Sequence, residues 1–126
     1  MRVSRGGKRE DIGIYVRSTW EANYARLLNW MVANGTIARW EYEPDLFEFP
    51  VKRGSKFYTP DFKVWANDGS YVYHEVKGYM DDVSATKLKR MRIHYPDEQL
   101  LLIDSKEYKK INKMFNRIIP NWEKMS

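Results

Sequence analysis

Helical periodicity is the clearest pattern along the chain. From Ser18, apolar residues recur three and four positions apart, as on one face of an amphipathic helix. These residues are Trp20, Tyr24, Leu27, Leu28 and Met31. Ser18 and Glu21 fit a capping box at a helix start, and Asn34-Gly35 can form the left-handed turn that ends a helix. The pattern therefore predicts a helix over residues 18–34.

Strand patterns follow this helix. Residues 37–50 alternate in character and break at Pro44-Asp45, which predicts extended strands. Their aromatic residues, interpreted as core side chains more readily than as a base-stacking platform, are Trp40, Tyr42, Phe47 and Phe49. Residues 62–66 and 71–77 flank an Asn-Asp-Gly-Ser turn and predict a β-hairpin. The continuous apolar run over residues 100–103 is typical of a strand covered on both faces.

Two more helices are expected in the second half of the chain. Residues 82–94 combine apolar residues with four cations and predict a helix with one strongly basic face. The cations are Lys87, Lys89, Arg90 and Arg92. Residues 108–118 again show amphipathic helical spacing. The order of helices and strands predicts an α/β fold with a mixed central sheet flanked by helices.

Length and charge favour one nucleic-acid-binding domain. The 126 residues can bury a single core, which we place over residues 14–126. Residues 1–13 predict a mobile basic arm, or no more than a frayed terminus. The cations of this arm are Arg2, Arg5, Lys8 and Arg9. A net charge of +5 makes a polyanion such as DNA a natural partner.

Several classes of function are disfavoured. The chain has no cysteine, which excludes disulfides, thiolate metal sites and cysteine nucleophiles. No apolar run approaches the roughly 20 residues of a membrane span, and the first residues do not resemble a signal peptide. We therefore expect a cytoplasmic protein with no membrane partner.

Two carboxylates and an ammonium group are expected to meet at one end of the hairpin. Asp61 precedes the first strand, and Glu75 and Lys77 lie near the end of the second. Because side chains alternate along a strand, Glu75 and Lys77 project from one face, and His74 projects from the other. Mg²⁺ or Mn²⁺ prefers carboxylate and water oxygens, and a lysine can offset charge that develops on a phosphate. These groups suit phosphodiester hydrolysis.

The residues Pro60-Asp61 and Glu75-Val76-Lys77, with Glu21 on the first predicted helix, resemble the PD-(D/E)XK nuclease superfamily. The nearest likeness is to phage endonuclease I-like Holliday junction resolvases. The resemblance implies a restriction-endonuclease-like fold, a catalytic set of Glu21, Asp61, Glu75 and Lys77, and a metal held by Glu21, Asp61, Glu75 and Val76. It implies a metal-dependent endonuclease acting on branched DNA as a homodimer. The expected DNA contacts are Arg2, Arg5, Lys8, Arg9, Arg17, Lys87, Lys89, Arg90 and Arg92.

Each of these residues also has a structural interpretation. Asp61 could cap a turn, Glu75 and Lys77 could lie on a solvated strand face, and Glu21 could serve only as a capping acid or as a partner of Arg17. The basic helix could be an ordinary solvated surface. For the whole chain, the alternatives are a nicking or end-cleaving nuclease of a repair or transposition complex, and a catalytically inactive nucleic-acid-binding module.

Overall fold

The computed structural model describes residues 5–124, in which the chain forms a mixed α/β fold. The helices are α1 (Thr19–Ala33), α2 (Asp82–His94) and α3 (Ser105–Phe115). The strands are β1 (Gly7–Arg9), β2 (Ile14–Val16), β3 (Arg39–Tyr42), β4 (Phe47–Glu48), β5 (Phe57–Tyr58), β6 (Phe62–Trp65), β7 (Tyr71–Lys77) and β8 (Leu100–Asp104). The central sheet has the order β3-β6-β7-β8, and two short hairpins, β1-β2 and β4-β5, stand beside it.

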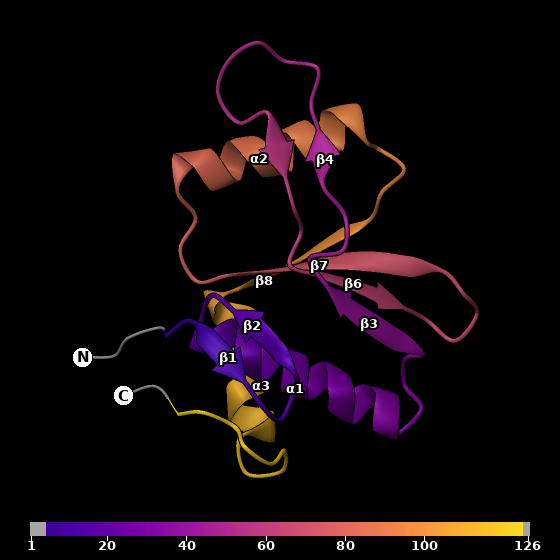
Figure 1. Cartoon of the computed structure of the whole chain (residues 1–126), viewed down its shortest axis with the longest axis vertical. Coiled ribbons are helices and arrows are strands. Elements are labelled where there is room, and N and C mark those ends of the chain that lie inside the picture. Colours follow the sequence, from indigo (N-terminus) through magenta and orange to yellow (C-terminus); the bar gives the residue numbers. More distant parts are fainter. Residues whose placement is uncertain (1–4, 125–126) are drawn as a thin grey trace.

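The central sheet is mixed because α2 connects two of its strands. β3, β6 and β7 pair antiparallel, whereas β7 and β8 run parallel on either side of the α2 crossover. In Figure 1, α1, α3 and the β1-β2 hairpin lie on one side of the sheet, and α2 lies with the β4-β5 hairpin on the other. This arrangement confirms the predicted α/β class with a mixed sheet flanked by helices.

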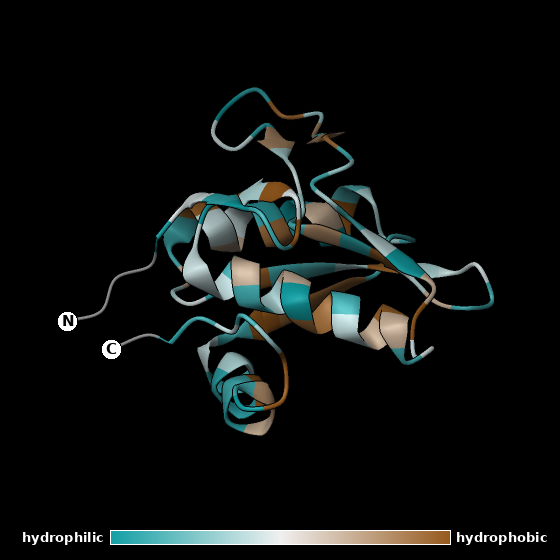
Figure 2. Cartoon of the chain, turned by 60° about the horizontal axis from the view of Figure 1, so that its bottom comes forward, coloured by the Kyte–Doolittle hydropathy of each residue, from teal (hydrophilic) through white to brown (hydrophobic). Residues whose placement is uncertain are grey.

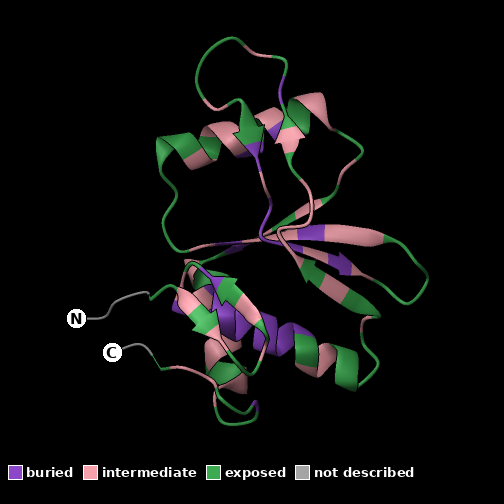
Figure 3. Cartoon of the chain, viewed as in Figure 1, coloured by how far each residue is buried: buried purple, intermediate pink, exposed green. Residues whose placement is uncertain are grey.

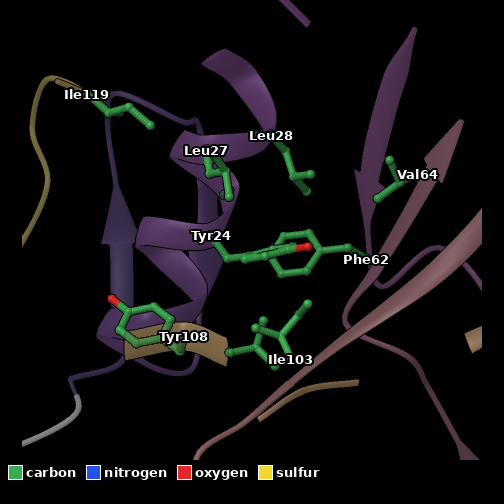
Figure 4. Packing of buried hydrophobic residues seen from close by; sticks show 10 residues of the cluster. Tyr24, Leu27, Leu28, Phe62, Val64, Ile103, Tyr108 and Ile119 are labelled. Atoms are coloured by element: carbon green, nitrogen blue, oxygen red, sulfur yellow. The ribbon is translucent and has the colours of Figure 1, made fainter. Parts of the chain in front are cut away.

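The two sides of the sheet have separate apolar cores. On the α1 side, Tyr24, Leu28, Phe62 and Ile103 belong to one buried cluster, and Figure 4 shows Tyr24 and Leu28 of the helix directed toward the strand residue Phe62. On the α2 side, a smaller cluster contains Phe49, Tyr58, Leu88 and Met91. In Figure 2, hydrophobic (brown) and hydrophilic (teal) segments alternate along the helices and strands. The candidate site described below lies where these two halves meet.

Helix α1 begins and ends close to its predicted bounds. The Ser18 side chain accepts a hydrogen bond from the Glu21 N–H at 3.1 Å, and Gly35 follows the helix with a φ of +81°. The first turns, through Leu28, are buried, and Figure 3 shows the far end of the helix more exposed. The buried part of α1 is therefore the part that reaches the site.

The N-terminal prediction of a mobile arm over residues 1–13 is wrong for residues 7–13. β1 and β2 pair as an antiparallel hairpin. Arg26 of α1, only 6% exposed, binds Asp11 at 2.7 Å and Glu123 at 2.8 Å, and Arg9 binds Glu123 at 2.6 Å. These ion pairs join the hairpin to α1 and to the C-terminal segment, so the folded unit includes residues that the sequence assigned to an arm. Arg2 lies outside the described residues.

Two other predictions need correction. The cations of α2 do not share one face. Lys87, which lines the cleft described below, and Arg90, which donates hydrogen bonds to the carbonyls of Arg53 and Ser55, lie three positions apart on one side of the helix. Lys89 lies about 200° around the helix from Lys87, and Arg92 lines a different cavity. Strand β8 is at the edge of the central sheet, and Leu101 is 48% exposed, so the run is not covered on both faces. In the part of the chain that the structure describes, no helix has the length and apolar character of a membrane span.

Candidate active site

Asp61 and Glu75 lie side by side where the β6-β7 hairpin begins and ends. Because Phe62 pairs with His74, Asp61 immediately before β6 is next to Glu75 in β7. The Asp61 N–H donates to Glu75 Oε1 at 3.2 Å, and the Val76 N–H donates to Asp61 Oδ2 at 2.8 Å. Asp61 is 3% exposed. The strand pairing thus places two carboxylates together, as the sequence predicted.

Glu21 brings a third carboxylate to this site from the first turn of α1. It is 7% exposed, and its Oε1 accepts from the Tyr42 hydroxyl at 2.5 Å and from the Arg17 N–H at 3.2 Å. Its negative charge contributes, after burial and Glu75, to raising the pKa of Asp61. Glu21 differs from a standard capping-box acid, because its side chain bonds the N–H of Arg17 and not that of Ser18.

Lys77 lies on the same side of β7 as Glu75. Burial raises the pKa of Glu75, and the positive charge of Lys77 partly offsets that rise. His74 lies on the opposite side of the strand, as predicted, and its Nδ1 is 2.6 Å from the Tyr24 hydroxyl of α1. Burial lowers the pKa of His74 to about 4. His74 is therefore neutral and bonded to α1, and Lys77 is the β7 residue that brings a positive charge to this site.

Of these carboxylates, Glu75 lines a cleft of about 290 Å³ between the two halves of the molecule. The cleft is lined by Arg17, Leu46, Phe57, Tyr58, Thr59, Glu75, Lys77, Ser84, Lys87 and Leu88. These residues come from the segment just before α1, from the β4-β5 hairpin and the residues beside it, from β7 and from α2. Three of them are cations and one is a carboxylate, so the cleft suits an anionic ligand that reaches Glu75.

Burial and mutual repulsion act on the two central carboxylates. Burial raises the pKa of Asp61 well above its usual range, and the negative charges of Glu75 and Glu21 raise it further. Burial also raises the pKa of Glu75, although hydrogen bonds from Tyr58 and the Asp61 backbone oppose the shift. Among residues 5–124, neither Asp61 nor Glu75 forms a salt bridge, and the charge of Lys77 offsets only part of the effect of burial, so the negative charge that the two groups carry when ionised is not fully matched. A bound divalent cation would supply that charge.

The carboxylates of the site suit a hard divalent cation. Carboxylate oxygens are the ligands that Mg²⁺ prefers, and Mg²⁺ usually keeps several waters. Among residues 5–124, however, no three Asp, Glu or His side chains stand where they could hold a metal ion together. The fit is therefore to a cation held by Asp61 and Glu75 with water. Glu21, bound to Tyr42 and Arg17, adds negative charge nearby. Val76 has an apolar, buried side chain, and its N–H orients Asp61.

The predicted DNA-binding cations are dispersed. Arg17, with a side chain 66% exposed, and Lys87 both line the cleft. Arg5, Lys8 and Lys89 are exposed on other parts of the surface, and Arg92 lines a different cavity. Arg9 is 12% exposed and bound to Glu123, and Arg90 holds the loop after β4. The structure therefore brings Arg17 and Lys87 to the candidate site and assigns Arg9 and Arg90 structural contacts.

Three residues of the site carry little sequence signal. Tyr58 donates to Glu75 Oε1 at 2.7 Å, and Tyr42 donates to Glu21. Glu43 lies 2.7 Å from the Arg17 guanidinium, and its φ of +49° is unusual for a residue with a side chain. Glu41, two positions before Glu43, binds Arg39 in an exposed ion pair. The available signal for these three residues was their position at or just after the end of a strand, since such positions lie near the predicted acids.

Comparison with known proteins places the chain in a family without assigning an activity. The family model described as "Protein of unknown function (DUF1064)" matches residues 7–112. The chain belongs to the DUF1064 family. The matched segment contains Glu21, Asp61, Glu75 and Lys77 as well as the β1-β2 hairpin. No curated protein matches the chain, and no solved structure matches it.

Proposed function

We propose that this member of the DUF1064 family is a metal-dependent endodeoxyribonuclease that hydrolyses branched DNA. The proposal depends on one observation above all: the buried Asp61 and the half-buried Glu75 are adjacent carboxylates, and Glu75 and Lys77 line a cationic cleft. Burying carboxylates together is costly unless a cation or proton compensates their charge. A site that binds both a divalent cation and a phosphate accounts for the acids and for the surrounding cations.

Phosphodiester hydrolysis assigns a role to each group. A bound Mg²⁺ or Mn²⁺ would polarise a phosphate oxygen and favour ionisation of an attacking water. Asp61 and Glu75 would hold the cation, and Tyr58 fixes the orientation of Glu75 through its 2.7 Å hydrogen bond. Lys77 offsets the charge that grows on the phosphate as the water oxygen bonds to phosphorus and the bond to the sugar oxygen breaks. Glu21 contributes to the negative potential that attracts the cation.

The DNA backbone would enter along the cations of the cleft. Arg17 and Lys87 stand on its two sides, one before α1 and one on α2. The loop between β4 and β5, on the α2 side of the sheet, adds the exposed cations Lys52, Arg53 and Lys56. Figure 3 shows this loop projecting from the fold. Such contacts with phosphate position DNA without reading its sequence. They suit a nuclease that recognises the shape of DNA.

A cleavage assay tests the proposed activity. Purified protein is incubated with four-way junction, flap, duplex and single-stranded DNA in Mg²⁺, Mn²⁺ or EDTA, together with the variants Asp61→Asn and Glu75→Gln. We expect metal-dependent cuts by the wild-type protein and at least a hundredfold loss in both variants. Asp97→Asn, on an exposed turn outside the cleft, is the matched control. DNA binding without cleavage by the wild-type protein would favour the inactive binding module.

The proposed preference for a four-way junction requires two equivalent sites. A twofold homodimer would supply them, because each subunit presents one site to one strand. Light scattering should then give a mass near twice 15.1 kDa, and junction DNA should receive paired, symmetrically placed nicks. A monomer that cuts linear duplex as readily as a junction would refute the resolvase assignment and leave the nuclease assignment in place.

A further inference from the structure

The cleft combines its charges with two exposed apolar side chains. Leu46, immediately before β4, is 65% exposed, and Phe57 in β5 is 47% exposed. Both line the cleft that contains Glu75, Lys77 and Arg17. We call them the Leu46–Phe57 rim. Neither belongs to the buried part of the apolar cluster beneath α2, so packing of the fold does not explain why these two side chains are apolar.

We propose that the Leu46–Phe57 rim binds one unstacked nucleobase of the DNA, so that the substrate carries an unpaired nucleotide at the cut site. This inference depends on the proposed nuclease function and specifies its substrate. A nucleotide is an apolar planar base joined to an anionic phosphate, and the cleft offers an exposed aromatic ring next to cations. Stacking on such a ring accepts any base, because every base has a π-face.

The size of the cleft supports one nucleotide over a duplex. At about 290 Å³, the cleft is close to the lower limit of roughly 300 Å³ for pockets that hold small molecules. A DNA duplex, whose major groove alone is about 12 Å wide, cannot enter such a space. A base that is already unpaired, as at a branch, gap or flap, avoids most of the few kcal/mol that unstacking a paired base costs.

The position of Phe57 connects base binding to the carboxylates. Phe57 and Tyr58 are neighbours in β5, and the Tyr58 hydroxyl donates to Glu75. Tyr58 is 5% exposed and packs in the α2-side core. The short β5 strand thus holds the exposed ring at a fixed place relative to Glu75. A base seated on Phe57 would bring its phosphate toward Lys77 and the cation site.

Equilibrium binding to short oligonucleotides in Ca²⁺, a cation expected to support binding and not cleavage, tests this proposal. The probes are a single-stranded oligonucleotide, the same strand with abasic positions, and the matching duplex. For the single strand, Phe57→Ala should weaken binding about 5- to 100-fold, as expected for one lost stacking contact. Abasic probes should bind the wild-type protein more weakly and show no further loss with Phe57→Ala. Phe57→Tyr, which keeps the ring, should bind as the wild-type protein does.

Leu101→Ala is the matched control, because Leu101 is 48% exposed but does not line the cleft. Equal affinity of Phe57→Ala and wild-type protein for the single strand, or equal affinity of wild-type protein for intact and abasic probes, would overturn the base-binding proposal. If cleavage in Mg²⁺ still depends on Asp61 in that case, the nuclease function stands alone. Base-dependent binding without any cleavage would instead refute the nuclease function and leave the rim as a binding site.

Discussion

Replacing Asp61 by asparagine should change how stability depends on pH. In the folded protein without metal, burial and the nearby carboxylates Glu75 and Glu21 raise the pKa of Asp61 from its ordinary 3.8 to about 9. Asp61 therefore holds a proton in the folded state over a range where the unfolded chain releases it. The stabilisation from this proton is complete below about pH 4 and is lost as the pH rises toward 9.

The expected size follows from proton linkage. Where unfolding releases one proton, the free energy of unfolding falls by about 1.4 kcal/mol per pH unit. From pH 5 to pH 8 the wild-type protein should thus lose about 4 kcal/mol relative to Asp61→Asn. The asparagine amide keeps an oxygen that can accept from the Val76 N–H, which holds Asp61 at 2.8 Å. The difference between the two proteins therefore reports mainly on the missing charge.

Urea unfolding of both proteins at several pH values, first in EDTA and then with Mg²⁺, measures this difference. Mg²⁺ favours the ionised carboxylate, so it should reduce the excess pH slope of the wild-type protein and stabilise it by about 1.4 kcal/mol at ten times the dissociation constant. Asp61→Asn should respond much less, and the control Asp97→Asn should behave as wild type. Equal pH slopes for wild type and Asp61→Asn in EDTA, or equal stabilisation of both by Mg²⁺, would refute this reasoning.

Three further predictions concern the fold around the site. His74→Gln should reduce the loss of stability in acid. Burial lowers the pKa of His74 to about 4, so the free energy of unfolding of the wild-type protein should fall by up to about 3 kcal/mol between pH 6.5 and pH 4. Urea unfolding measures this difference. Gly78→Ala should cost about 1–2 kcal/mol in the same assay, because a Cβ would lie 3.1 Å from the Trp20 ring. Arg26→Met should lower the free energy of unfolding by about 2 kcal/mol or more and speed proteolysis of the β1-β2 hairpin, because it leaves Asp11 without its partner. Resistance to proteolysis equal to that of the wild-type protein would contradict the proposed anchoring of the hairpin.

The sequence predicted those parts of the structure that depend on local pattern. The apolar spacing from Trp20 to Leu28 defines α1, and the Asp-Gly turn between residues 66 and 71 defines the β6-β7 hairpin. Once the hairpin is known, side-chain alternation alone puts Glu75 and Lys77 on one face. Strand pairing then puts Asp61 beside Glu75. The central pair of carboxylates was predictable because its geometry is contained within one hairpin.

The remaining features depend on contacts between distant residues. The β1-β2 hairpin has strands too short to show a period, and its anchors include Glu123, more than a hundred positions from Arg9. Tyr58 reaches Glu75 from a separate two-residue strand. On α2, charge composition suggested one basic face, but α-helical geometry separates Lys87 from Lys89 by about 200°. Composition could predict the charge of this helix but not where each cation points.

The proposed catalytic acids also hold the local structure together, which affects how their roles can be separated. Asp61 accepts from the Val76 N–H, Glu75 accepts from Tyr58, and Glu21 accepts from Tyr42. Truncating any of them to alanine would leave a partly buried donor without its acceptor, at a cost of about 1–3 kcal/mol. An alanine variant that lost activity would therefore not distinguish a chemical role from local unfolding. The amides keep the acceptor oxygen and remove only the charge, so lost cleavage in a stable Asp61→Asn or Glu75→Gln protein would identify the carboxylates as chemical groups of the site.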